Sequence, residues 1–286
     1  MKQIVVISGK GGTGKTVLTA AFASLAESKV MADCDVDAAD LHLLLNPRIV
    51  KKSIFKSGST AVVDKNLCTN CGKCLEVCRF EAILPGFTVD PIACEGCAFC
   101  SFVCPSQAIT MEENISGEWY ISDTKYGPMV HAKLGIAEEN SGKLVTLVKQ
   151  TARDMASAAG KEYVIIDGSP GIGCPVIASL ADADLALIVT EPTLSGMHDM
   201  KRVVDVAGHF NVKTAVVINK FDINKKVTEE IIEFLKEEDI VHISNLVYDE
   251  SFTKAMTIGK TIVEYNNSNL TKVLIESWDK IKGEIL

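Results

Sequence analysis

The sequence contains no long apolar segment and no excess of positive charge. No apolar run approaches the roughly 20 residues that a membrane-spanning helix needs. The formal net charge is −8 and the isoelectric point is near 5.2. The chain therefore has no basic surplus for a nucleic-acid backbone or an anionic membrane. We expect no nucleic-acid partner and no membrane partner.

We also expect no secretory leader, because a short apolar strand follows Met1, Lys2 and Gln3 directly. We therefore expect a cytoplasmic protein. In a reducing compartment, the ten cysteines favour metal binding or catalysis over disulfides. The 286 residues, 47% of them hydrophobic and 23% charged, suffice for one large α/β domain that carries a smaller insertion.

A glycine-rich loop stands between an apolar run and a helix-forming segment near the N-terminus. The run covers residues 4–7, the helix-forming segment covers 17–23, and the loop reads GKGGTGKT. This is a phosphate-binding pattern, in which backbone N–H groups converge on phosphate oxygens at a helix N-terminus. Lys15 is expected to reach the β- and γ-phosphates and Thr16 to hold Mg²⁺. The residues expected to contact nucleotide here are Gly9, Gly11, Gly12, Thr13, Gly14, Lys15, Thr16 and Val17.

Carboxylates directly follow two of the predicted strands. Apolar residues 30–32 lead into an acidic segment over 33–40, and the apolar run 163–166 ends at Asp167. Open α/β sheets bind ligands at the carboxyl ends of their strands, so both acidic segments are expected beside the phosphate loop. Asp167 is expected to act on Mg²⁺ through water. Gly171 lies where a backbone N–H could sense the γ-phosphate.

A second lysine, Lys10, lies inside the loop and is too close to bound phosphates to be indifferent to them. With this lysine the loop resembles the deviant Walker A motif of the MinD, Mrp and nitrogenase iron protein superfamily, within the SIMIBI class of P-loop ATPases. In that family the first lysine reaches across a dimer interface to the partner's nucleotide. The resemblance therefore implies a homodimer formed through the nucleotide site, and ATP hydrolysis with Lys10, Lys15, Asp35 and Asp167 as the catalytic candidates.

The acidic segment resembles switch I of the same family, whose two-aspartate element organises the Mg²⁺ shell and the attacking water. Asp35 matches the second aspartate, while Asp37 and Asp40 stay open as alternatives for positioning the water. Asp33 is expected to be structural.

Asn219 follows the predicted strand 214–218, and its side-chain amide can read the donor and acceptor edge of adenine. The family uses an asparagine in this way. The string NKFD over residues 219–222 also resembles the guanine-recognition motif of GTPases. Lys10 and the two aspartate segments favour ATP, so ATP and Mg²⁺ are the expected cofactors.

Eight of the ten cysteines fall within 37 residues in two copies of one spacing, C-x₂-C-x₂-C-x₃-C. This spacing is typical of bacterial ferredoxins, in which three close thiolates bind one 4Fe–4S cluster and the fourth ligand comes from the other repeat. The sequence therefore predicts two 4Fe–4S clusters. One ligand set is Cys68, Cys71, Cys74 and Cys104, and the other is Cys78, Cys94, Cys97 and Cys100.

Zinc is the rival metal, but zinc ribbons use paired C-x₂-C motifs rather than two complete runs. Arg79 stands where a proline often follows the last cysteine, and its charge could change the potential of the nearby cluster. Cys34 is expected to be a packing residue. Cys174 lies at the spacing where the nitrogenase iron protein has one of its cluster ligands. That protein needs a second cysteine per subunit, and this chain has none between Asn114 and Asp167. A packing role is therefore favoured for Cys174, and a redox role stays open. His198 is expected at the surface.

The expected fold is a mostly parallel P-loop NTPase sheet with helices on both faces, over residues 1–60 and 115–286. A small α+β ferredoxin domain is inserted over residues 61–114. We expect an ATPase whose nucleotide state couples to electron transfer through the two clusters, acting with an unidentified redox partner. The alternative is an iron–sulfur or metallocofactor assembly ATPase with a corresponding partner. The C-terminal segment has helical spacing and no basic excess, which favours packing on the sheet over membrane binding.

Overall fold

The computed structural model describes residues 1–135, 141–265 and 268–285, which divide into two compact units. The larger unit comprises Met1–Ser53, Trp119–Lys133 and the residues from Ser141 onward. The smaller unit comprises Ile54–Glu118 with Leu134 and Gly135. The chain passes from one unit to the other inside the long strands β3 and β6, and again at the end of β7.

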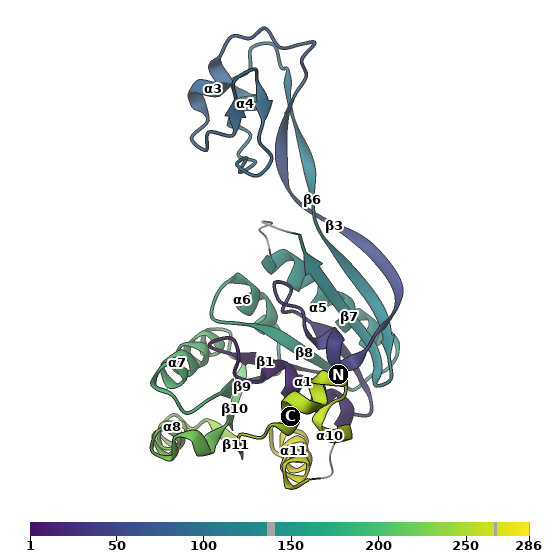
Figure 1. Cartoon of the computed structure of the whole chain (residues 1–286), viewed down its shortest axis with the longest axis vertical. Helices are drawn as coiled ribbons and strands as arrows, with labels where there is room; N and C mark the ends of the chain where they lie inside the picture. Colours follow the sequence, from purple (N-terminus) through teal and green to yellow (C-terminus); the bar gives the residue numbers. More distant parts are fainter. Residues whose placement is uncertain (136–140, 266–267, 286) are drawn as a thin grey trace. The chain divides into compact units, whose positions relative to one another are not determined.

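Within the described ranges, nine strands form one sheet in the order β11-β10-β9-β1-β8-β2-β7-β6-β3 (Figure 1). The seven strands from β11 to β7 are parallel neighbours, as the sequence predicts for a doubly wound α/β fold. The strands are β1 (Lys2–Ser8), β2 (Lys29–Asp33), β3 (Arg48–Val63), β6 (Ile109–Thr124), β7 (Gly127–Leu134), β8 (Tyr163–Pro170), β9 (Leu185–Thr190), β10 (Lys213–Asn219) and β11 (Val241–Leu246).

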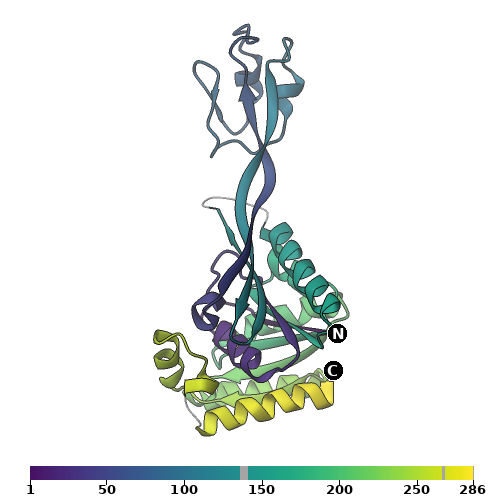
Figure 2. The same cartoon turned by 90° about the vertical axis from the view of Figure 1, so that its right-hand side faces the viewer.

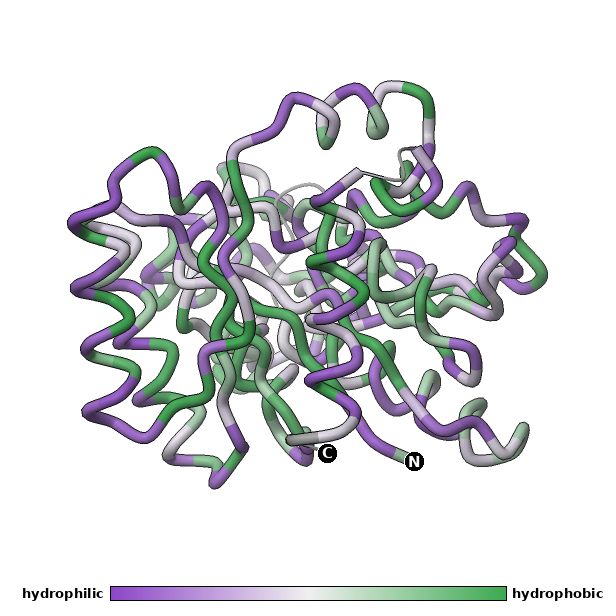
Figure 3. Tube along the Cα trace, turned by 90° about the horizontal axis from the view of Figure 1, so that it is seen from below, coloured by the Kyte–Doolittle hydropathy of each residue, from purple (hydrophilic) through white to green (hydrophobic). Residues whose placement is uncertain are grey.

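Helices cover both faces of the parallel part of the sheet, because right-handed crossovers in opposite directions place them on opposite sides. The described helices of the larger unit are α1 (Lys15–Leu25), α2 (Leu41–Leu45), α5 (Ser141–Ala158), α6 (Cys174–Leu180), α7 (Leu194–His209), α8 (Lys225–Glu237), α9 (Ser251–Thr257), α10 (Ile262–Tyr265) and α11 (Asn269–Lys280), with short turns η1 (Phe221–Ile223) and η2 (Ile281–Ile285). Hydrophilic and hydrophobic residues alternate along the covering helices (Figure 3), as expected for helices with one buried side.

A hydrophobic core cluster of the larger unit lies between the sheet and the helices α1 and α11. Phe22 of α1 packs near Trp278 of α11, with ring centroids 5.8 Å apart. Leu270 and Leu274 of α11, the yellow helix in Figure 2, are buried in the same cluster. The prediction that the C-terminal segment packs on the sheet is therefore confirmed. Among the described residues, no helix is long and apolar enough to cross a bilayer.

The smaller unit contains the parts of β3 and β6 that lie between Ile54 and Glu118. Two hydrogen bonds join these strands: the Ser116 hydroxyl donates to the Ser57 carbonyl, and the Thr60 hydroxyl donates to the side-chain oxygen of Asn114. Because the residue number increases along β3 while that of its partner on β6 decreases, the two strands are antiparallel. The other elements of this unit are α3 (Lys73–Val77), β4 (Ile83–Leu84), β5 (Thr88–Val89) and α4 (Phe99–Phe102).

Candidate functional site

The loop between β1 and α1 has the close backbone packing that its glycines predict. Gly14 caps α1 with φ of 95°, and a Cβ placed there would lie 2.5 Å from Nδ2 of Asn219. A Cβ on Gly9 would lie 2.4 Å from Cβ of Asp199. In the part of the chain that the structure describes, no side-chain cap hydrogen bond is made at the N-cap Gly14. The first N–H groups of this helix are therefore left for a ligand, as in an anion site.

Lys15 lies at the centre of a buried charge cluster at the carboxyl ends of β2 and β8. Its Nζ is 3.0 Å from Oδ2 of Asp35 and 3.1 Å from Oδ1 of Asp167, and its side chain is only 6% exposed. Burial lowers the pKa of Lys15, but the Asp167 and Asp35 carboxylates raise it and the net shift is upward. The ammonium group therefore stays charged in this position.

Carboxylates outnumber cations in this cluster. Asp33 pairs with Asp167 in the β2–β8 register and is fully buried. Burial, and then the charge of Asp167, raise the pKa of Asp33 well above its usual range. The buried Oδ2 of Asp167 and the buried hydroxyl of Thr13 have no hydrogen-bond partner in the described parts of the chain. Unpaired buried acceptors beside excess negative charge suit a hydrated cation, although the described residues hold no ready-made group of three His, Cys, Asp or Glu around one ion.

The aspartates of the acidic segment have separate positions. The carboxylate of Asp33 accepts hydrogen bonds from the backbone N–H of Asp35 at 3.2 Å and of Leu41 at 3.3 Å. Asp33 therefore shapes the loop after β2. Asp37 and Asp40 are exposed, whereas Asp35 contacts Lys15. In this conformation, Asp35 is the aspartate of the three candidates that reaches the charge cluster.

Lys10 is held by its own chain. Its Nζ lies 2.6 Å from Oε1 of Glu191, and Nζ of Lys220 lies 3.2 Å from the other oxygen of the same carboxylate. Glu191 belongs to no motif in the sequence, but it directly follows β9 at the carboxyl edge of the sheet, where ligands bind. Reaching a partner molecule would require Lys10 to leave this pair.

Asn219 contacts the phosphate loop from the end of β10. Its Nδ2 donates to the Thr13 carbonyl at 2.8 Å, and its Oδ1 accepts from the Lys220 backbone N–H at 3.0 Å. The nitrogen and the oxygen of the Asn219 side-chain amide thus both make hydrogen bonds within the chain. To bind adenine, Asn219 would have to replace these two hydrogen bonds with hydrogen bonds to the base. Asp222 is also occupied, since it accepts from the Tyr248 backbone N–H at 2.7 Å. The bond to Tyr248 leaves less capacity for the guanine contact that the NKFD string suggests.

The backbone N–H of Gly171 donates to the Ser8 carbonyl at 2.8 Å. The residue has φ of 92°, which favours glycine. The predicted contact with a γ-phosphate would therefore require this hydrogen bond to open. The bond joins the end of β8 to the start of the phosphate loop, so its opening would move the two together.

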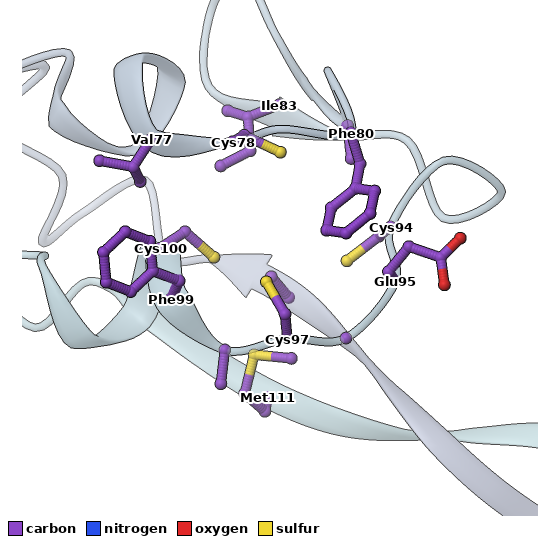
Figure 4. A pocket seen from close by; sticks show the side chains of 14 residues that line it. Val77, Cys78, Phe80, Ile83, Cys94, Glu95, Cys97, Phe99, Cys100 and Met111 are labelled. Carbon is purple, nitrogen blue, oxygen red and sulfur yellow. The ribbon is translucent and has the colours of Figure 1, made fainter.

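The eight clustered cysteines line two separate pockets of the smaller unit. The first, the Cys94 pocket, contains Cys78, Cys94, Cys97 and Cys100 (Figure 4). The second, the Cys68 pocket, contains Cys68, Cys71, Cys74 and Cys104. Their volumes are about 360 and 310 Å³, including space open to solvent. These are the same two sets that the repeat predicts as ligands, and all eight cysteines are free thiols.

The two cysteine repeats also share their backbone conformation at an offset of 26 residues. Asn70 and Gly96 both have positive φ, of 56° and 64°, and Glu81 and Gln107 share values of 53° and 50°. The backbone N–H of Asp64 donates to the Ala108 carbonyl at 2.7 Å, and that of Asp90 to the Ala82 carbonyl at the same distance. The smaller unit thus has internal twofold pseudosymmetry.

A family model for the CobQ/CobB/MinD/ParA nucleotide binding domain matches residues 4–262. The chain belongs to this family. An uncharacterized protein of Methanocaldococcus jannaschii is 36% identical over 232 residues, which cover 78% of this chain and 79% of the relative. The septum site-determining protein MinD of Thermotoga maritima is 27% identical over 296 residues, which cover 98% of this chain and 88% of that protein.

Solved structures of family members share the fold. MinD of Pyrococcus horikoshii, complexed with Mg-ADP, has a TM-score of 0.61 and 16% identity, covering 99% of this chain and 96% of that one. The cell division ATPase MinD of Pyrococcus furiosus has a TM-score of 0.59 and 18% identity, covering 98% of each chain. The predicted membership in this P-loop ATPase family and the predicted parallel α/β fold are confirmed.

Cys34, Cys174 and His198 were also noted in the sequence, and of these Cys34 adjoins the charge cluster, where its backbone N–H donates to the Asp167 carbonyl at 2.8 Å. Cys34 is fully buried, and burial raises the pKa of its thiol, which matches a packing role. Cys174 is exposed at the start of α6, so the favoured packing role for this cysteine is wrong. His198 is exposed on α7, with Nδ1 3.4 Å from Oδ1 of Asp199, as expected for a surface residue.

Proposed function

We propose that this protein is an ATP-hydrolysing iron–sulfur protein that couples the nucleotide state of a homodimer to electron transfer. The proposal gives it a P-loop ATPase domain over residues 1–60 and 115–286 and an inserted ferredoxin domain over residues 61–114. The observation that carries it is the division of eight cysteines into two complete four-cysteine pockets in a chain of a nucleotide-binding family.

In the nucleotide site, the chain's own residues bind and orient the substrate. The N–H groups of the phosphate loop and α1 hold the phosphates, and Lys15 turns from Asp35 and Asp167 toward the β- and γ-phosphates. Once released by Lys15, Asp35 can orient the attacking water. Thr16 and Asp167 would hold Mg²⁺ and its water, a role that the unpaired Oδ2 of Asp167 supports, and the ion would neutralise phosphate charge.

In the smaller unit, each four-cysteine pocket would hold one 4Fe–4S cluster, which supplies one-electron redox chemistry when bound. Each thiolate of such a set binds a different iron atom. Four cysteines therefore surround a hollow instead of converging on one point, which accounts for the lack of a single-ion site among the described residues. The pocket linings include apolar side chains such as Val77 and Phe87.

The test is to measure composition and turnover on one anaerobic preparation. We expect about eight iron atoms and eight sulfide ions per chain, and Mg²⁺-dependent phosphate release from ATP. One zinc ion per pocket, or a preparation without sulfide, would refute the cluster proposal. Loss of iron on adding ATP would instead favour the assembly function.

Replacement of Asn219 by alanine is expected to weaken ATP binding by roughly tenfold, because loss of the bond to the Thr13 carbonyl loosens the phosphate loop. Binding of Mg-tripolyphosphate, which has no base, should weaken by a similar factor in calorimetry. If the variant binds tripolyphosphate normally and only ATP is affected, Asn219 reads adenine and does not anchor the loop.

Replacement of Glu191 by glutamine is expected to strengthen the ATP-dependent dimer about two- to fivefold. The change weakens the pair that holds Lys10 within its own chain, and a partly exposed ion pair contributes up to about 1 kcal/mol. Sedimentation with a slowly hydrolysed ATP analogue measures the dimer constant. Glu229→Gln on the exposed side of α8 is the matched control; a weaker dimer in Glu191→Gln would show that Glu191 supports the interface instead.

A further inference from the structure

The pseudosymmetry of the smaller unit allows its two pockets to be compared position by position. With the 26-residue offset, the cysteines and their small apolar neighbours are equivalent: Ala82 and Ile83 line the Cys94 pocket as Ala108 and Ile109 line the Cys68 pocket. The backbone turns that carry them also match. Any difference between the two sites must therefore come from the few equivalent positions where the side chains differ.

Two of these positions differ in charge. Lys73, the first residue of α3, lines the Cys68 pocket, and its equivalent at the start of α4 is Phe99 in the Cys94 pocket. Thr69 lines the Cys68 pocket, and its equivalent is Glu95. The Cys68 pocket thus has a cation where the other has a phenyl ring, and a neutral hydroxyl where the other has a carboxylate. Figure 4 shows Glu95 and Phe99 at the Cys94 pocket.

A third position differs in polarity. Ser106 lines the Cys68 pocket and lies 3.7 Å from Sγ of Cys104, which also accepts the backbone N–H of Ala108 at 3.3 Å. The equivalent of Ser106 is Phe80, which lines the Cys94 pocket (Figure 4). A cysteine sulfur of the Cys68 pocket can therefore accept a hydrogen bond from a hydroxyl group. At the equivalent position, the Cys94 pocket has only the apolar ring of Phe80.

These three differences act in the same direction on a bound cluster. Reduction adds negative charge, so a nearby cation and hydrogen bonds to the sulfurs favour the reduced form, whereas a carboxylate and an apolar surround oppose it. Lys73 and Glu95 are both exposed, so solvent and salt weaken their effect without changing its sign.

Two other differences oppose these three. Arg79 adjoins Cys78 where the other repeat has Pro105, but it is exposed and lines neither pocket. Phe87 of the Cys68 pocket is equivalent to Ala61 of the Cys94 pocket and adds apolar surface, but no charge.

We infer that the two clusters are inequivalent and that a single electron given to the chain resides at the Cys68 pocket. The inference rests on the proposed function, because it needs both clusters. We expect the electron to prefer this pocket by at least about tenfold, which corresponds to about 59 mV between the two one-electron midpoints. In the titration, the electron comes from dithionite through soluble mediators, so one reductant equivalent reduces one cluster.

The test is an anaerobic redox titration of the full chain, followed by EPR, on protein with a measured iron content. Two midpoints are expected. Lys73→Gln should lower only the upper midpoint and Glu95→Gln should raise only the lower one, so each variant assigns a midpoint to a pocket. Lys56→Gln, which changes an exposed lysine on β3 that lines neither pocket, is the control and should move neither.

Failure of the inference and failure of the proposed function give different results in this titration. Two bound clusters with one shared midpoint, or a Lys73→Gln change that moves the lower midpoint, would overturn the inference and leave the proposed function standing. Iron well below about eight atoms per chain in wild-type protein would remove the proposed function and the inference with it. Both substitutions are at exposed positions, so cluster assembly should survive them.

Discussion

ATP turnover is expected to fall by at least about 10²-fold when Lys15 is replaced by glutamine, since removal of one preorganised donor to developing charge has an effect of this size. Lys15 is the cation between Asp35 and Asp167. Without it, two carboxylates face the phosphates, and binding of the substrate weakens as well. Phosphate release under anaerobic conditions measures the loss.

The same substitution should also destabilise the nucleotide-free protein by roughly 3–5 kcal/mol, because it leaves buried carboxylates without their partner. Lys15→Arg retains the charge, but its planar guanidinium group cannot take the compact position of the ammonium. We expect Lys15→Arg to remain folded and still to be inactive. Lys225→Gln, on the exposed start of α8, is the control. A folded Lys15→Arg protein with normal turnover would contradict the role of Lys15.

Alanine in place of Cys104 is expected to halve the iron content, from about eight to about four atoms per chain. Cys104 belongs to the second repeat in the sequence but lines the Cys68 pocket in the structure. Its loss should therefore remove the cluster of the first repeat. Iron analysis and EPR of the anaerobic protein measure which cluster is left.

Double variants decide the ligand sets by iron count alone. Cys71→Ala combined with Cys104→Ala should still retain about four iron atoms, because both changes affect one pocket. Cys97→Ala combined with Cys104→Ala should retain almost none, because each pocket loses a ligand. The reverse pattern would mean that each repeat binds its own cluster. Cys34 and Cys174 line neither pocket, so the Cys34→Ala and Cys174→Ala variants should retain both clusters.

The parts of this account that the sequence predicts are those set by local pattern. The glycines that identify the phosphate loop are close together in the sequence. The continuous apolar runs predict the buried parallel strands. The exchange of the fourth cysteine ligand follows from a spacing typical of one kind of site. In each case the residues that decide the structure are close in sequence or repeated within it.

Features that depend on contacts between distant segments could not be predicted. Glu191 meets Lys10 across more than half of the chain's length, and the amide of Asn219 reaches Thr13 only because β10 ends beside the phosphate loop. The full extent of β3 is not evident from the sequence either. Its first residues, from Arg48 to Lys52, are exposed on both sides of the strand, so they lack the alternation that identifies a strand.

We propose that nucleotide state and cluster chemistry are coupled in one protein. The most direct test is the EPR-monitored redox titration repeated with Mg-ATP, with Mg-ADP and without nucleotide. We predict that nucleotide shifts at least one midpoint or alters one cluster signal, while about eight iron atoms remain bound per chain. Two bound clusters whose midpoints and signals are identical in all three conditions would contradict the coupling.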